Sequence, residues 1–243
     1  MFLALALIVS WWFAALVTPR APERLDARMI ADGAGGHWLA WCERGDRDVV
    51  GLRLTRLDAE GQARSGWLDE GLAIDEAQDA QREPALALDG RGGLWLAWSD
   101  RRGGPRRIHA AHVGADGARL SPSRRLGGQG REEFHPTVMS AGDGGAYIAW
   151  QSWDGRSSDV QAIRLMPDGE PATGWPVHGL GVADSPFDEC SPHWIARPEG
   201  PGLSWIAYDG PEPSQGRQRE ALLSRGEPRI LWRDGPFGRM HAR

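Results

Sequence analysis

Four copies of one short phrase constrain the fold of this chain more than any other feature. Each copy holds a glycine-rich turn and then an apolar run that closes on an aromatic residue, as in "GGLWLAWSDRR". The closing aromatics are 57, 52 and 58 residues apart, and a turn glycine follows each of them after 18 to 20 residues. Such regular spacing indicates one structural unit used four times. The closing aromatics are Trp41, Trp98, Trp150 and Tyr208.

Each copy divides into four short runs rich in alternating apolar, β-branched and aromatic residues. In the second copy these runs are "PALALD", "GLWLAWS", "RRIHAAHV" and "ARLSPSRRL", and the separators between them carry Gly or Asp-Gly, which suit tight hairpins. No sustained helical periodicity follows Val17. Four antiparallel strands at a period above fifty residues are typical of propeller blades. We therefore predict an all-β propeller of four four-stranded blades, either as a small closed ring or as half of a larger one.

The repeats also predict the domain organisation. We expect an N-terminal segment at residues 1–20, one propeller domain and a short C-terminal tail. The recurring aromatics should pack between the blades, since aromatics in register within strands usually form a core. The propeller is expected at 21–234, with blades at approximately 24–81, 82–134, 135–190 and 191–234, and the tail at 235–243.

The first seventeen residues, "MFLALALIVSWWFAALV", carry no charged side chain. This run is short for a helix that spans a membrane and long for the core of a signal peptide. A cleaved signal peptide, a retained membrane anchor formed by residues 1–17 and a buried N-terminal helix all remain open. We expect the protein to be exported, either to the periplasm or to the extracellular space.

The charge balance argues against nucleic acid as a partner. The chain has 28 basic residues, all of them arginine, against 33 acidic residues, and the basic residues form no block. Binding to the phosphate backbone needs such a block. We therefore expect a protein or carbohydrate ligand, with the membrane involved only through the N-terminal segment, and we expect no cofactor.

Charged side chains gather at one end of the predicted blades, which we call the loop face. It carries the entries to the first strands and the loops that follow the second strands. Ion pairs between these loops could simply brace them, because exposed pairs are common and individually weak. The same groups could instead bind a ligand. The candidate binding residues are Glu83, Arg101, Arg102, Glu133, His135, Trp153, Asp154 and Asp188.

The two cysteines fall on the same predicted face. Cys42 ends the second strand of the first blade and Cys190 begins the fourth blade, and these blades would be neighbours in a closed ring of four. Together with export to an oxidising compartment, this placement suggests a Cys42–Cys190 disulfide. Two independent buried thiols are the alternative.

No catalytic or metal-binding motif stands out. His109 and His112 are an odd number of positions apart on a strand and should point to opposite faces, so we assign no metal site to them. His135 and His193, near Cys190, could form a small site at the channel, but their spacing matches no known metal loop. Tyr147 lies in a repeat strand, so we predict that it is a core residue.

The repeat also resembles a known group of proteins. Its elements are Pro before an apolar residue, then D-G-x-G-G, an apolar run ending in Ala-Trp, an Asp-Arg loop and the closing "GWPVHGLGV". In these features the chain, from about Leu25 to Asp234, is similar to secreted bacterial β-propeller proteins of the BNR or sialidase-like group. The Asp box of sialidases reads S-x-D-x-G-x-x-W, whereas "LDGRGGLW" has one residue more between Asp and Trp and no Ser.

Two functions follow as hypotheses. The leading one is an exported, non-enzymatic propeller that acts as a binding or scaffold module, because the sequence offers no evident catalytic constellation. The alternative is a glycoside-acting enzyme of sialidase-like ancestry that uses carboxylates on the loop face. If the ring is incomplete, a homodimer could close it.

Overall fold

In the part of the chain that is described, all regular elements are strands, in four antiparallel sheets that follow one another along the chain. The description rests on a computed structural model. Among the residues it describes, no helix is long and apolar enough to cross a membrane. The described residues are 22–45, 50–75, 81–128, 130–183, 185–208, 216–224, 228, 230–233 and 240–242.

Within each sheet the strands follow chain order, so that each strand pairs with the next one in the sequence. The first strand of each sheet therefore lies at one edge. The fourth sheet has a fifth strand. The strands are β1 (Glu23–Ala31), β2 (His37–Arg44), β3 (Val50–Leu57) and β4 (Leu72–Ala73); β5 (Gln81–Leu88), β6 (Leu94–Asp100), β7 (Arg107–Val113) and β8 (Arg124–Arg125); β9 (Glu132–Ser140), β10 (Ala146–Trp153), β11 (Ser158–Leu165) and β12 (Leu180–Ala183); and β13 (Glu189–Arg197), β14 (Gly200–Tyr208), β15 (Gly216–Leu223), β16 (Ile230–Arg233) and β17 (Met240–Ala242).

The D-G-x-G-G phrase forms the turn between the first and second strands. In the second sheet, Asp89 Oδ1 accepts hydrogen bonds from the backbone N–H groups of Arg91 (2.6 Å) and Gly93 (3.0 Å). A Cβ atom at Gly93 would lie 2.4 Å from the carbonyl oxygen of Val113, so only glycine fits there. Asp32 caps the equivalent turn of the first sheet in the same way. In the third sheet Asp143, two positions further along the turn, accepts from the N–H of Gly145.

The other oxygen of the turn aspartate ties the turn to the next sheet. Asp32 Oδ2 accepts from Arg56 Nε at 2.9 Å, and Arg56 Nη1 also donates to the carbonyl oxygen of Ala115 in the second sheet (3.4 Å). In the second sheet, His112 takes the place of the arginine. Its Nε2 lies 3.0 Å from the turn aspartate and its Nδ1 lies 2.9 Å from the carbonyl oxygen of Pro167 in the third sheet. The turns of the first and second sheets are thus anchored on the blade that follows each of them.

Two of the four closing aromatics, Trp98 and Trp150, lie in cores between the sheets, as the sequence predicts, whereas Trp41 is buried outside these cores and Tyr208 is half-buried. Trp98 belongs to the core between the first and second sheets, Trp150 to the core between the second and third, and Tyr147 to the core between the third and fourth. The side chains of all three are almost completely buried. Trp98 packs against the preceding sheet, and Trp95, three residues earlier on β6, against the following one.

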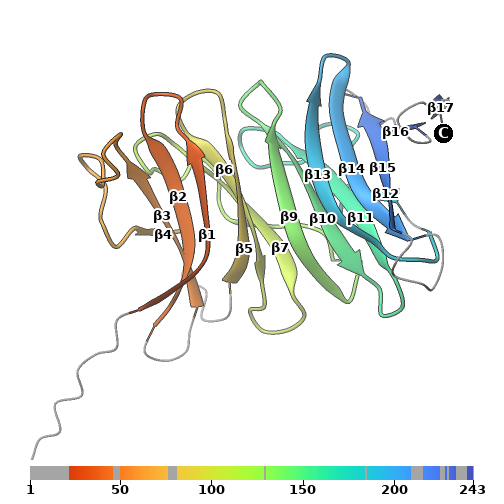
Figure 1. Cartoon of the computed structure of the whole chain (residues 1–243), viewed down its shortest axis with the longest axis horizontal. Coiled ribbons are helices and arrows are strands. Elements are labelled where there is room, and N and C mark those ends of the chain that lie inside the picture. The colour runs from red at the N-terminus through yellow and green to blue at the C-terminus, as the bar shows by residue number, and fades with distance from the viewer. Residues whose placement is uncertain are drawn as a thin grey trace, which may run out of the picture.

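The four sheets lie side by side in chain order, with the first at one end of the row and the fourth at the other (Figure 1). Three buried cores join consecutive sheets, and within the described residues no such core joins the fourth sheet to the first. The prediction of an all-β propeller with four blades is confirmed. Of its two forms, the structure has the open one.

The predicted disulfide is not formed. Cys42 and Cys190 are both free thiols, Cys42 buried and Cys190 half-buried. They lie in the first and fourth sheets, the two ends of the row, and would become neighbours only if the ring closed on itself (Figure 1). The N-terminal segment, on which the export and anchor hypotheses depend, lies outside the described residues.

Candidate functional site

Each sheet has a backbone irregularity at the same place near the start of its first strand. A residue other than glycine adopts a positive φ there, between 50° and 56°. The register between the first and second strands shifts at this point in every sheet, as in a β-bulge. Left-handed residues other than glycine cost free energy and gather at functional sites. We call them the bulge residues: Asp26, Glu83, His135 and Ser191.

Three of the four bulge residues, Glu83, His135 and Ser191, line a pocket of about 520 Å³, and Asp26 is not part of its lining. Its walls come from the first strands of all four sheets, β1, β5, β9 and β13. The lining combines apolar side chains such as Met29 and Val138 with a few polar ones. This mixture is typical of a small-molecule site. The polar lining residues are Arg28, Glu83, His135, Thr137, Ser191 and His193.

Hydrogen bonds connect the bulges of neighbouring sheets. The carboxylate of Asp26 accepts from the backbone N–H of Glu83 at 3.4 Å, and the carboxylate of Glu83 accepts from the backbone N–H of His135 at 3.0 Å. A second oxygen of Glu83 lies 3.3 Å from His135 Nε2 and 4.0 Å from Arg106 Nη1. Three successive blades are therefore linked along one side of the pocket, with Glu83 at the centre.

The exposure of these groups leaves them open to a ligand. The side chain of His135 is 56% exposed and that of Glu83 is 25% exposed. Glu83 is thus partly shielded from water, yet its carboxylate borders the pocket. A carboxylate in such a position can exchange a proton with a bound molecule or accept hydrogen bonds from it.

Of the eight residues predicted as binding candidates, the structure places Glu83 and His135 in the pocket. The other six are not part of its lining. Trp153, at the end of β10, keeps 36% of its surface exposed. Arg101 pairs with Glu132 at 3.3 Å, and Glu133 is buried, where it accepts from the backbone N–H of Gly128 at 2.6 Å. Asp154 accepts from the N–H groups of its own loop, and Asp188 accepts from the N–H of Ser158 at 2.8 Å.

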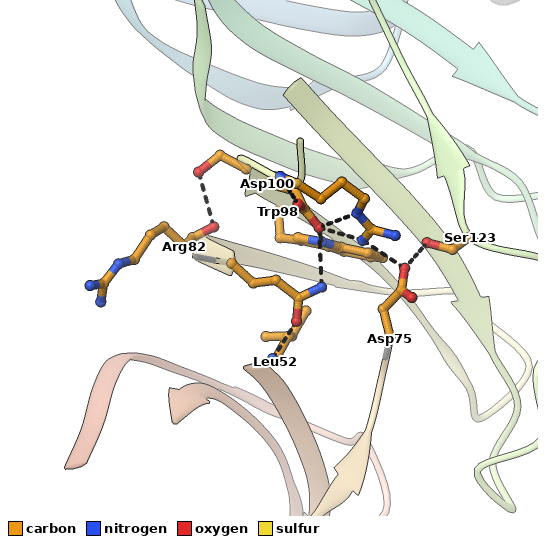
Figure 2. Close-up of polar contacts among 9 residues, drawn as sticks. Leu52, Asp75, Arg82, Trp98, Asp100 and Ser123 are labelled. Atoms are coloured by element: carbon orange, nitrogen blue, oxygen red, sulfur yellow. Dashed lines mark hydrogen bonds and ion pairs between the residues drawn. The ribbon is translucent and has the colours of Figure 1, made fainter. Parts of the chain in front are cut away.

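Arg102 belongs to a brace between the first two blades (Figure 2). It donates to Asp100 and, at 2.9 Å, to Asp75, which also accepts from the hydroxyl of Ser123 at 2.8 Å. Burial pushes the pKa of Asp100 up, but the hydrogen bonds from Arg102 outweigh it and hold that pKa below its usual range. The charged groups of the brace pair with one another, which fits the bracing alternative for this part of the loop face.

The histidines near the centre of the second sheet have structural roles. His109 stacks on Trp98 with 5.8 Å between ring centroids, and His112 stacks on Trp95 at 4.6 Å. Because those two tryptophans belong to different cores, the histidines lie on opposite faces, as predicted. Within the described ranges, no group of three or more His, Cys, Asp or Glu residues could hold a metal ion.

Comparison with known proteins identifies the fold. No family model matches the chain, and no curated protein matches it in sequence. Among solved structures, the GH93 α-L-arabinofuranosidase of Fusarium graminearum superposes with a TM-score of 0.56 and 12% identity, covering 93% of this chain and 70% of that one. The Hadza microbial sialidase Hz136 gives 0.53 and 14%, covering 84% and 45%. A putative glycoside hydrolase from Parabacteroides distasonis gives 0.50 and 11%, covering 86% and 71%.

These comparisons confirm the resemblance to sialidase-like propellers at the level of the fold. They also correct the leading functional hypothesis, which was a non-enzymatic binding or scaffold module. The structures that share this fold are mostly glycoside hydrolases, so they support the enzymatic alternative. That hypothesis relied on the absence of a local catalytic motif. The groups that meet at the pocket are far apart along the chain, so no local motif contains them.

Proposed function

We propose that this protein is a glycoside-acting enzyme whose sugar site is the pocket between the four first strands. One observation carries the proposal: the partly shielded carboxylate of Glu83 borders that pocket from a strained bulge, with a second carboxylate, Asp26, on the neighbouring bulge. The propeller fold, which this chain has in common with an arabinofuranosidase and a sialidase, supports it.

The chemistry of glycoside hydrolysis suits this arrangement. Most glycosidases use two carboxyl groups, one to protonate the leaving oxygen and one to act as base or nucleophile. Glu83 supplies one carboxyl group at the pocket. Asp26, on the adjacent bulge just outside the pocket lining, supplies a second, and the two differ in environment. Glu83 is 25% exposed and held by His135, whereas Asp26 is 39% exposed and lies 3.9 Å from Arg82 Nη1. Different surroundings allow two carboxyl groups to take different roles.

The pocket has the size and lining that a sugar needs. Its volume of about 520 Å³ falls within the usual range for small ligands, roughly 300–1,000 Å³. Apolar side chains such as Met29 can cover the C–H face of a pyranose or furanose ring. Arg28 and His193 border the same space and can donate hydrogen bonds to hydroxyl or carboxylate oxygens of the ligand.

Turnover of 4-nitrophenyl glycosides tests the proposal. We expect the purified protein to hydrolyse at least one member of a panel that includes α-L-arabinofuranosides and sialosides. Glu83→Gln should lower kcat on that substrate by ~100-fold or more, as expected for loss of a general acid or base. Asp58→Asn is the matched control, because Asp58 caps a turn at the opposite end of the first sheet and should leave kcat unchanged. Absence of turnover across the whole panel would refute the proposal.

The cellular setting belongs to the proposal as well. We propose that the enzyme acts in the periplasm or outside the cell, on the strength of its apolar N-terminal segment, either free or anchored by residues 1–17. A homodimer that joins two open rows of blades also remains a prediction. It is motivated by the three cores of the described residues, none of which joins the first sheet to the fourth.

A further inference from the structure

We propose that Glu83 and His135 share one proton between Oε1 and Nε2, and that this pair, oriented by Gln151, is the proton donor to the leaving group. The inference rests on the proposed function for its chemical role. The shared proton itself is a property of the free protein and can be tested separately.

Both ring nitrogens of His135 lie close to a side-chain oxygen. His135 Nδ1 lies 3.2 Å from Gln151 Oε1, and Nε2 lies 3.3 Å from Glu83 Oε1. An amide oxygen can only accept, so Nδ1 carries a hydrogen. If Nε2 carried none, its lone pair would face a carboxylate oxygen, which is repulsive. A proton between Nε2 and Oε1 makes both contacts favourable.

Glu83 has no freedom to turn away. Its Oε2 accepts from the backbone N–H of His135 at 3.0 Å, while Oε1 faces the ring of the same residue. One residue thus binds both oxygens and presents one of them to Nε2. Arg106 Nη1 lies 4.0 Å from Oε1 and places a positive charge on the other side of the carboxylate.

The four repeats differ in the residues at their bulges. The four bulge positions are equivalent in the fold, yet an acid is followed by a histidine in the next blade only at the junction of the second and third sheets. At the preceding junction the acid is followed by another acid, and at the following one the histidine is followed by a serine. The side chain that orients the ring, Gln151, comes from β10 and is buried, which holds its amide in place.

The step balances without any further reagent except water. The bond between the anomeric carbon and the leaving oxygen breaks, and its electron pair stays on that oxygen. The proton shared by His135 and Glu83 moves to the same oxygen. Water adds to the anomeric carbon, and the proton that this water loses restores the pair through solvent. His135 is therefore a catalytic residue and Gln151 a positioning residue.

Leaving-group dependence distinguishes this role from a structural one. A proton donor matters for a methyl glycoside, whose leaving group is poor, and hardly at all for a 2,4-dinitrophenyl glycoside of the same sugar. We expect His135→Asn to lower kcat/KM by ~100-fold or more on the methyl glycoside and by less than about 5-fold on the dinitrophenyl one. Asparagine tolerates the left-handed backbone at this position, and Gln151→Leu should show the same pattern, weaker by about tenfold.

The controls separate the failure of this inference from that of the proposed function. His37→Gln, at the opposite end of the first hairpin, should change neither substrate class. Equal losses on both classes for His135→Asn would overturn the donor role. The ¹⁵N spectrum of the His135 ring tests the pair even if no glycoside is turned over. We expect both nitrogens to be protonated in the wild type and one to lose its proton in Glu83→Gln, and a neutral ring in the wild type would overturn the shared proton.

Discussion

Replacing Asp32 with asparagine tests how the repeated turns stabilise the fold. Asp32 Oδ1 accepts from the N–H groups of Ala34 (2.7 Å) and Gly36 (2.8 Å), and Oδ2 accepts from Arg56 and Arg64. Its carboxylate is fully buried. In Asp32→Asn, one oxygen can still cap the turn. The new NH₂ group would point at two guanidinium groups and leave Arg56 without a counter-charge.

The size of the effect follows from the pKa of Asp32. Burial alone would raise it, but the two backbone hydrogen bonds and Arg56 outweigh burial and lower it from 3.8 to about 2. A shift of roughly 2 units corresponds to about 2.5 kcal/mol. Removing one partner of a buried ion pair costs ~3 kcal/mol or more at neutral pH. We therefore expect Asp32→Asn to lower the free energy of unfolding by about 3 kcal/mol at pH 7.

The pH dependence has a definite sign. A carboxyl whose pKa is lowered on folding contributes stability that is present above its unfolded pKa and lost as the pH falls through the folded value. The wild type should lose that contribution between about pH 4 and pH 2, whereas Asp32→Asn has no carboxyl group at this position to titrate. The difference between the two proteins should shrink over this range.

Urea unfolding followed by tryptophan fluorescence at pH 7, 4 and 2.5 measures the effect. Asp58→Asn is the control, since Asp58 caps its turn at the surface by accepting from the N–H groups of Glu60 and Gln62. We expect it to cost less than about 1 kcal/mol at each pH. A difference between wild type and Asp32→Asn that stays the same at all three pH values would refute the reasoning.

Two further predictions concern buried titratable groups. Burial raises the pKa of the Cys42 thiol to about 12. Iodoacetamide at pH 8 should therefore modify only the half-buried Cys190 in the native protein, and both cysteines after unfolding in urea. Two labels before unfolding would contradict this prediction. Burial also raises the pKa of Glu133, against the opposing effect of its hydrogen bond from Gly128. The contribution of such a carboxyl group to the free energy of unfolding is lost as the pH rises through its pKa in the folded protein. Glu133→Gln should therefore flatten the decline in the free energy of unfolding above pH 4.5, and an unchanged slope would show that Glu133 does not cause it.

The architecture could be predicted from the sequence because it depends on local chemistry repeated in register. The D-G-x-G-G turns and the alternating strands specify four-stranded blades. The position of Trp98 within its strand places that residue between blades. Similarly, the odd spacing of His109 and His112 put them on opposite faces of β7. Each inference needs only neighbours along the chain or across a hairpin.

The sequence placed Glu83 and His135 on the same loop face, but their contact could not be predicted, because it depends on the three-dimensional path of the first strands. Glu83 and His135 are 52 residues apart, and no local pattern shows that they meet. The prolines that follow three of the bulges are visible in the sequence, but the left-handed backbone of Glu83 is not. The disulfide prediction failed for a related reason, since it assumed ring closure, which the repeats do not determine.

The anchoring of the first two turns on the following blade has a consequence for folding. Arg56 satisfies the turn of the first blade and a carbonyl group of the second, and His112 does the same between the second and third. A blade on its own would leave these donors without their second acceptor. Ordering should therefore spread from one blade to its neighbour, with stability set by junctions rather than by separate units, as in a one-dimensional cooperative chain.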